Sequence, residues 1–208
     1  MNWVLPRKLL SPVRQFTRDG HNEVLFRDLE LTSNSVVLDF GGYIGEFSEE
    51  ILQRFDCQLH IFEPVQLFVN ELRKRFEGSE KVWIYDYAVG LKQRDFFLVL
   101  DGEATSEFRG SIGLPCSLRS VDQTIIPRLS SIDLIAINIE GGEYELVPAL
   151  YQAGVLNKVG QILIQFHKVG PNSDESVAQI RAIMRETHTL EWRYEYVWEL
   201  WKIVEKAK

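Results

Sequence analysis

The sequence predicts an α/β fold built on a doubly wound, mostly parallel sheet. Short apolar runs alternate with helix-like segments along the 208 residues, a rhythm typical of parallel sheets covered by helices on both sides. The runs VVLDF and IDLIAINI are apolar at nearly every position, as in strands buried on both faces. The first run is followed by the glycine pair Gly41 and Gly42, which predicts a sharp turn from a strand into a helix.

The elements follow from apolar periodicity. In chain order we predict a strand at 36–40, a helix at 45–55, a strand at 58–64, a helix at 66–76, strands at 82–89 and 96–101, an excursion over 102–120, a strand at 132–141, a helix at 143–152, a strand at 161–167 and a helix at 176–187. The tail alternates Trp192, Tyr194, Tyr196 and Trp198, which predicts an antiparallel C-terminal strand. The tail contains neither Gly nor Pro, so the position of its turn is left open.

Charge divides the chain into an arm and a body. Residues 1–18 carry four basic side chains and no acid, although the whole chain has a net charge of −7. We therefore divide the chain into an N-terminal basic arm with a lead-in helix (1–33) and one α/β domain (34–208). The arm either makes peripheral contact with an anionic membrane or packs on the domain. An acidic body disfavours nucleic acid as a partner.

Cysteine content and hydropathy point to a cytoplasmic protein. The two cysteines, Cys57 and Cys116, are too far apart in the sequence for a metal knuckle and too few for a disulfide framework, as expected in a reducing compartment. The longest apolar runs are too short to cross a bilayer, and the first residues do not form a signal peptide. No cluster has metal-ligand spacing, so no metal is expected.

The glycine turn excludes two common nucleotide sites. A dinucleotide fingerprint that ends at Gly45 would need glycine at position 40, which is Phe40. A P-loop would need Gly-Lys-Ser/Thr, which does not follow. The pattern present is Asp39-x-Gly41-x-x-x-Gly45, with the acid before the glycines. That order suits a ligand with a free ammonium group and no pyrophosphate, namely S-adenosylmethionine.

Two further acids end the next strands. Glu63 closes the second strand, where a carboxylate can accept hydrogen bonds from both ribose hydroxyls. Asp86, near the end of the third strand, can accept from an adenine amino group, with Ala88 against the base. Because parallel strands end at one edge of a sheet, these acids are expected to meet there. The expected cofactor-binding set is Asp39, Gly41, Gly42, Tyr43, Gly45, Glu63, Pro64, Asp86 and Ala88.

With these motifs the sequence resembles the FkbM family of S-adenosylmethionine-dependent methyltransferases. The segments LDFGGYIGEFS, IFEP and DYAVG are similar to the first three motifs of that family, and IDLIAINIEGGEYELVPAL is similar to its most specific segment. The resemblance covers about residues 34 to 170. It implies a Rossmann-like class I methyltransferase fold and a hydroxyl on a glycan or small secondary metabolite as the methyl acceptor.

Two positions depart from the family pattern. Tyr43 stands where asparagine is common, and its ring either covers the cofactor or turns outward. Asn138 stands where aspartate is usual. An amide cannot take a proton as a carboxylate can, so Asn138 is expected to orient the substrate or cofactor by hydrogen bonding.

Transfer to a hydroxyl requires a proton acceptor. Glu140 and His167 are the best candidates, because each follows a strand at the same sheet edge. Their structural alternatives are a hydrogen bond that pins the Gly141-Gly142 turn and a capped imidazole at a strand end. The sequence thus predicts an O-methyltransferase; the alternative is a regulatory protein that binds the cofactor without turnover, an alternative suggested by Asn138.

Overall fold

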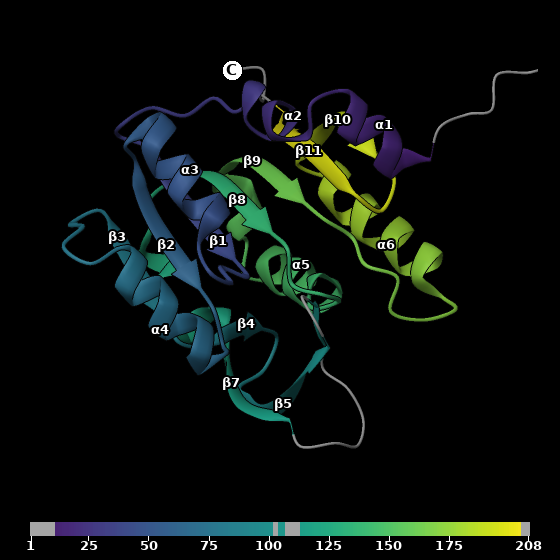
Figure 1. The fold of residues 1–208 in the computed structure, drawn as a ribbon. Helices are drawn as coiled ribbons and strands as arrows, with labels where there is room; N and C mark the ends of the chain where they lie inside the picture. Colours follow the sequence, from purple (N-terminus) through teal and green to yellow (C-terminus); the bar gives the residue numbers. More distant parts are fainter. Residues whose placement is uncertain (1–10, 102–103, 107–112, 205–208) are drawn as a thin grey trace, which may run out of the picture.

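The computed structural model describes residues 11–101, 104–106 and 113–204 of the chain. Its core is a seven-stranded sheet in the order β10-β11-β9-β8-β1-β2-β3, with helices on both faces (Figure 1). The parallel strands are β1 (Val36–Phe40), β2 (Gln58–Phe62), β3 (Val82–Tyr85), β8 (Ile132–Ile137) and β9 (Val159–Ile164). At one edge, β11 (Trp198–Ile203) is antiparallel to both β9 and β10 (His188–Tyr194). The predicted mostly parallel sheet with an antiparallel C-terminal strand is confirmed.

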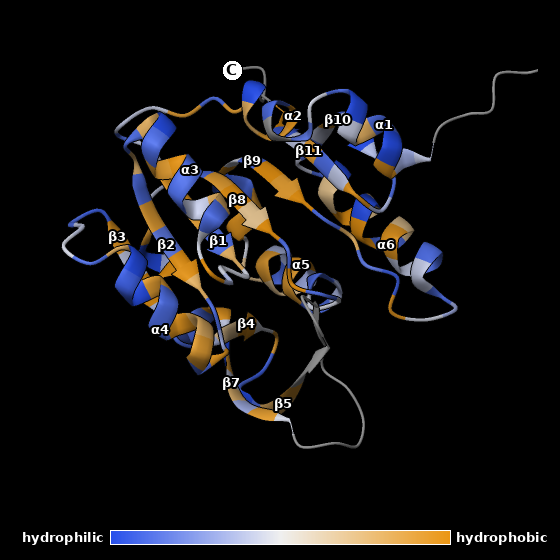
Figure 2. Cartoon of the chain, viewed as in Figure 1, coloured by the Kyte–Doolittle hydropathy of each residue, from blue (hydrophilic) through white to orange (hydrophobic). Residues whose placement is uncertain are grey.

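Two apolar layers cover the sheet, because successive side chains of a strand point to opposite faces. One layer lies under α2 (His21–Arg27), α3 (Glu46–Phe55) and α4 (Gln66–Arg75), and joins Val37 of β1 to Ile51 and Leu72. The other lies under α5 (Glu143–Gln152) and α6 (Ser173–Arg185), and joins Leu38 to Leu150. Figure 2 shows the apolar strands between helices whose outer surfaces are polar. Every central strand is thus fixed from both sides.

A second, smaller sheet lies between β3 and β8 in the sequence. Its order is β4-β7-β5-β6, formed by β4 (Ala88–Gly90), β7 (Leu114–Ser120), β5 (Arg94–Asp101) and β6 (Ala104–Ser106). The predicted single strand at 82–89 is therefore wrong: residues 82–85 pair with β2, whereas residues 88–90 pair with β7. Part of the predicted excursion over 102–120 lies outside the described residues. Short 3₁₀ turns at Val121–Gln123 and Ile126–Arg128 lead on to β8, and another at Val155–Lys158 leads to β9.

Both ends of the described chain pack against β10: α1 (Pro12–Arg18) lies near Tyr194, and Ile203 of β11 pairs with His188. Helix α1 places the Phe16 ring 5.1 Å from the Tyr194 ring, and the Tyr194 hydroxyl donates to Asp19 at 3.0 Å. The first ten residues of the predicted basic arm lie outside the described residues. No helix in the described ranges is long and apolar enough to span a membrane.

Candidate active site

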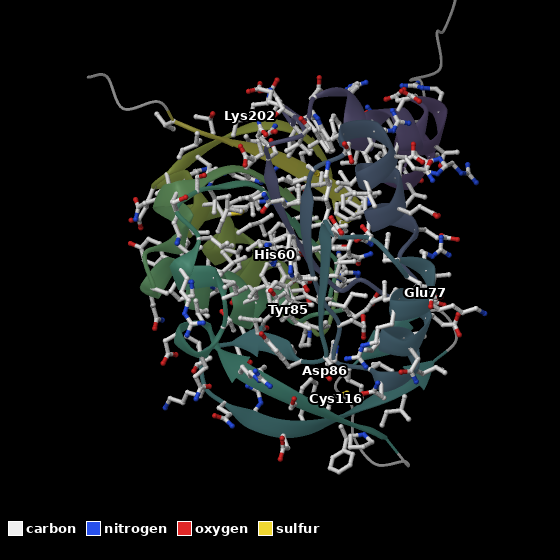
Figure 3. All side chains as sticks on the ribbon, turned by 90° about the vertical axis from the view of Figure 1, so that its left-hand side faces the viewer. His60, Glu77, Tyr85, Asp86, Cys116 and Lys202 are labelled. Atoms are coloured by element: carbon white, nitrogen blue, oxygen red, sulfur yellow. The ribbon has the colours of Figure 1, made fainter. Side chains whose placement is uncertain are left out.

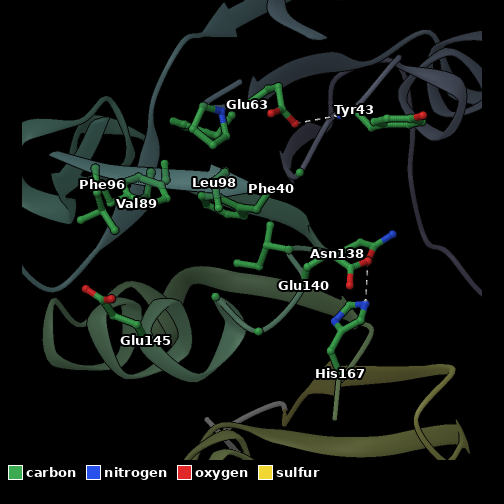
Figure 4. A pocket seen from close by; sticks show the side chains of 18 of the residues that line it. Phe40, Tyr43, Glu63, Val89, Phe96, Leu98, Asn138, Glu140, Glu145 and His167 are labelled. Atoms are coloured by element: carbon green, nitrogen blue, oxygen red, sulfur yellow. Dashed lines mark hydrogen bonds and ion pairs between the residues drawn. The ribbon is translucent and has the colours of Figure 1, made fainter. Parts of the chain in front are cut away.

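A cavity of about 760 Å³ opens at the carboxyl ends of β1, β2, β8 and β9 (Figure 4). It brings together eight residues predicted for the site: Gly41, Tyr43, Glu63, Pro64, Ala88, Asn138, Glu140 and His167. The predicted residues Asp39, Gly42, Gly45 and Asp86 are not part of its lining. Its volume lies within the range of small-molecule sites.

The glycine turn packs tightly against the neighbouring strands. Gly41 has a φ of 92°, and a Cβ there would lie 2.1 Å from the carbonyl oxygen of Asn138. A Cβ on Gly42 would lie 2.2 Å from a methyl carbon of Ile61. Both positions therefore exclude larger side chains, and the turn is held against the residues that follow β8. Gly45, with a φ of 88°, directly precedes α3.

Asp39 faces α3 and not the cavity. The residue is 4% exposed, and its carboxylate accepts a hydrogen bond of 2.5 Å from the Ser48 hydroxyl. Burial raises the pKa of Asp39 to about 6, and the Ser48 hydrogen bond opposes that rise. The side chain thus joins the end of β1 to the first turn of α3.

Glu63 is the buried carboxylate of the cavity. It accepts hydrogen bonds from the backbone N–H groups of Tyr43 at 3.0 Å and Val65 at 2.9 Å. Burial raises the pKa of Glu63 to about 7, although these two hydrogen bonds act in the opposite direction. A carboxylate has about four acceptor sites, so Glu63 can still accept from a ligand.

Aromatic and aliphatic side chains form the wall around Glu63. The Tyr43 ring, 39% exposed, packs edge-on against Phe68 with ring centroids 4.5 Å apart, so it lies at the rim. Beyond Pro64 and Ala88, the apolar lining consists of Phe40, Phe62, Phe68, Val89, Phe96, Leu98, Leu118, Ile139 and Val169. The part from β5 was not predicted, because FFLVLD is apolar at five successive positions and does not show which side chains face the cavity. Glu145, bound to Arg94 by two hydrogen bonds of 2.8 Å, also lines this end.

Asp86 lies on the surface. Its carboxylate is about half exposed and pairs with Arg73 at 3.3 Å (Figure 3). Strand β3 ends at Tyr85, which is paired with Phe62 of β2, so Asp86 follows its strand just as Glu63 follows β2. Its side chain nevertheless turns to Arg73 and does not line the cavity. Its predicted contact with an adenine amino group has no support in this geometry.

A strained turn presents Glu140 at the opposite end of the cavity. Glu140 has a φ of 49° and Gly141 a φ of 106°, so two successive residues have a positive φ. Such a φ is unusual for a residue other than glycine, as Glu140 is. Strain of this kind is concentrated at functional sites. A Cβ on Gly141 would lie 2.5 Å from Val169 Cγ1, so the turn is packed against the segment that follows β9.

His167 lies between two glutamates. Its Nε2 is 3.2 Å from Glu140 Oε1, but the orientation does not make a hydrogen bond. Its Nδ1 is 3.2 Å from Glu143 Oε1, and its backbone N–H donates to the same oxygen at 2.8 Å. Burial alone would lower the pKa of His167, but the Glu143 hydrogen bond and the charges of both glutamates raise it above its ordinary value. The sequence analysis predicted Glu140 and His167 for the site but did not pair either residue with Glu143.

Asn138 completes this end of the cavity. Its backbone N–H donates to the Phe40 carbonyl at 3.0 Å, and its exposed side chain makes no hydrogen bond with the described residues. Its amide is therefore available to a ligand. Within the described ranges, no group of three or more His, Cys, Asp or Glu residues could hold a metal ion.

Comparison with known proteins finds similar structures at low sequence identity. No protein-family model and no curated protein matches the sequence. The N-methyltransferase NodS from Bradyrhizobium japonicum WM9 has a TM-score of 0.51 at 11% identity, over 92% of this chain and 98% of that chain. SMU.1697c from Streptococcus mutans, solved in complex with SAH, has a TM-score of 0.52 at 11% identity, over 94% and 99% of the two chains. The Methanococcus jannaschii fibrillarin pre-rRNA processing protein has 0.52 at 11%, over 84% and 69%. The chain therefore has the Rossmann-like α/β fold of methyltransferase structures such as NodS.

Proposed function

We propose that this chain is an S-adenosylmethionine-dependent methyltransferase of the FkbM type. The observation that supports this most is Glu63: a buried carboxylate at the end of β2 that faces the cavity and retains acceptor capacity. Glu63 would accept from the ribose hydroxyls, Pro64, Ala88 and the apolar wall would hold the base, and Asn138 and the glycine turn would hold the methionyl part. The SAH complex of the similar Streptococcus mutans protein supports the same ligand class. When bound, the cofactor supplies an electrophilic methyl group.

We further propose a hydroxyl of a glycan or small secondary metabolite as the acceptor. A hydroxyl must lose a proton during transfer, and a positioned base accelerates such a step about 10²- to 10⁴-fold. Glu140 and His167 line the cavity 3.2 Å apart, so this end carries proton acceptors as well as room for a ligand. Mass spectrometry of a cell extract, incubated with the protein and isotopically labelled cofactor, should reveal a methylated product with its label on oxygen.

Isothermal titration with S-adenosylhomocysteine tests the cofactor assignment. Each charged hydrogen bond is worth about 1.5–3 kcal/mol, so Glu63→Ala should weaken binding at least about tenfold. Asp86→Ala is the matched control, because that carboxylate lies outside the cavity, and it should leave the Kd unchanged. Absence of binding to the wild type, or equal effects of the two substitutions, would remove the proposal.

Asn138 supports a second candidate, a regulatory protein that binds the cofactor without turnover. The Asn138 amide makes no hydrogen bond with the described residues, and it stands at a position where the FkbM family usually has aspartate. Asn138→Asp separates the two functions: activity gained from an inactive wild type would favour the regulatory candidate, whereas efficient wild-type turnover would reject it.

A further inference from the structure

His167 Nε2 is a buried nitrogen at the cavity that makes no hydrogen bond. Of the buried side-chain nitrogen and oxygen atoms in the described residues, only Trp192 Nε1 shares that condition, and Trp192 packs in the apolar layer under α2 and α3. Buried polar atoms without a partner are rare in proteins, and each needs an explanation. Nε2 is therefore placed where a ligand hydroxyl could complete its bonding.

Glu143 holds the opposite ring nitrogen. The side chain is fully buried. Oε2 accepts from the Gly141 N–H at 2.8 Å, while Oε1 accepts from the His167 N–H at 2.8 Å and lies 3.2 Å from Nδ1. A carboxylate can only accept, so Nδ1 must be the donor in this contact. In a neutral imidazole that arrangement leaves the lone pair on Nε2.

We propose that Glu143 is the positioning residue that keeps the proton of His167 on Nδ1, so that Nε2 takes the proton of the acceptor hydroxyl. This inference rests on the proposed function. As the hydroxyl O–H bond breaks, its proton passes to Nε2 and the freed electron pair on oxygen bonds the methyl carbon, while the C–S electron pair stays on sulfur. The resulting imidazolium lies between Glu143 and Glu140, and its proton then passes to solvent.

The groups around His167 agree with this role. Glu140 faces it from the turn after β8, and Glu143 from the start of α5. Tyr144 donates its hydroxyl to the His167 carbonyl at 2.7 Å. Lys168 turns away, with Nζ 4.4 Å from the Tyr196 ring centroid and 3.7 Å from Asp174. Both charges nearest the ring are thus negative, which favours the imidazolium formed during transfer.

The tautomer can be measured in the free protein, without turnover. In ¹⁵N-histidine-labelled protein, the His167 signals are identified by their loss in His167→Gln, which distinguishes them from those of the other three histidines. Above the pKa of His167 we expect a protonated, pyrrole-type Nδ1 and an unprotonated, pyridine-type Nε2. A wild-type spectrum with the proton on Nε2 would overturn the inference, whether or not the protein is active and even if no Glu143 variant folds.

Variants then separate positioning from a purely structural role. Glu143→Gln should lower the pKa of His167, move the acidic limb of the kcat–pH profile by the same amount, and reduce kcat about 10- to 100-fold, with the Kd for S-adenosylhomocysteine unchanged. Glu143→Asp should restore part of kcat. Glu140→Gln is the comparison variant: it also removes a negative charge near the ring, so it should lower the pKa of His167, but the ¹⁵N spectrum should still show the proton on Nδ1. A fall in kcat with no change in the His167 pKa or in the pH profile would reject the positioning role.

Discussion

At the scale of single residues, Glu63 links ligand binding to pH. Its pKa is raised to about 7 by burial, so below that pH Glu63 is mostly protonated in the free protein. Glu63 must lose this proton before it can accept hydrogen bonds from both ribose hydroxyls. The affinity for S-adenosylhomocysteine should therefore rise from pH 6 to pH 8, by at most about tenfold per unit on the acidic side. Titration calorimetry in a His167→Gln background removes the imidazole's own titration; equal Kd values at pH 6 and pH 8 would contradict this role for Glu63.

Gly41 should be far less tolerant of a side chain than another left-handed glycine. Gly41 and Gly78 have φ values of 92° and 78°, but a Cβ on Gly78 would meet nothing within 4 Å. The left-handed conformation alone costs alanine about 1–2 kcal/mol. Gly78→Ala should lose about that much free energy of unfolding in urea, whereas Gly41→Ala should lose clearly more, because its Cβ meets the Asn138 carbonyl. Similar losses in both variants would show that the turn can relax.

Strand-end residues were predictable, but their partners were not. The sequence analysis found Glu63, Glu140 and His167 because parallel strands end at one edge of a sheet, and the end of each strand can be recognised from its own apolar run. Asp86 also follows the end of its strand, but its side chain pairs with Arg73 on the surface and does not enter the cavity. The bond between Glu143 and His167 joins residues 24 positions apart, and it depends on how α5 begins beside the chain that follows β9.

At the scale of elements, Arg181 ties α6 to the C-terminal hairpin. It pairs with Glu195 at 2.8 Å and more closely with Glu199, whose side chain is 1% exposed. Arg181→Met would leave the Glu199 carboxylate buried without its cation, at a cost of about 3–5 kcal/mol. Arg193→Met is the matched control: Arg193 pairs with Glu195 at 3.3 Å, and both side chains are 40% exposed, so its cost should be below about 1 kcal/mol.

Urea unfolding of both variants measures the difference. Equal free energies of unfolding would mean that the Glu199 carboxylate does not depend on Arg181, and that the hydrogen bond of 2.9 Å from the Trp201 indole N–H is enough to hold it.

Helices and strands with strong periodicity were predicted to within a few residues. Strand β1 and helix α5 have the predicted bounds. The tail was predicted as strand, but its turn was not, because Tyr196 takes the left-handed conformation with a φ of 54°, which local propensity assigns to Gly or Asn. The small sheet was missed as a unit, since the pairing between β4 and β7 joins residues thirty positions apart in the sequence.

At the scale of the whole molecule, buried histidines should limit stability in acid. Burial lowers the pKa of His60 and His188 to about 4, while an unfolded histidine titrates near 6.5. The unfolded state therefore binds more protons as the pH falls from 6.5 towards 4, and the free energy of unfolding falls with it.

His60→Phe should remove part of that loss and keep the stacking on Trp83, whose ring centroid lies 4.8 Å away. Between pH 7 and pH 5, the wild type should lose up to about 2 kcal/mol more than this variant. The opposing contributions of Asp39 and Glu63 cancel in the comparison. His21→Phe, at an exposed position, should behave as the wild type; equal losses in all three proteins would contradict the prediction.

The position of β11 has a consequence during protein synthesis. Although β11 is the last strand along the described chain, it lies between β9 and β10. A nascent polypeptide that has left the ribosome only as far as β10 therefore keeps β9 as an open edge, with unpaired backbone groups that invite association with other chains. Docking of the β10–β11 hairpin covers that edge, and mutations that delay it should increase dependence on chaperones before they alter the folded protein.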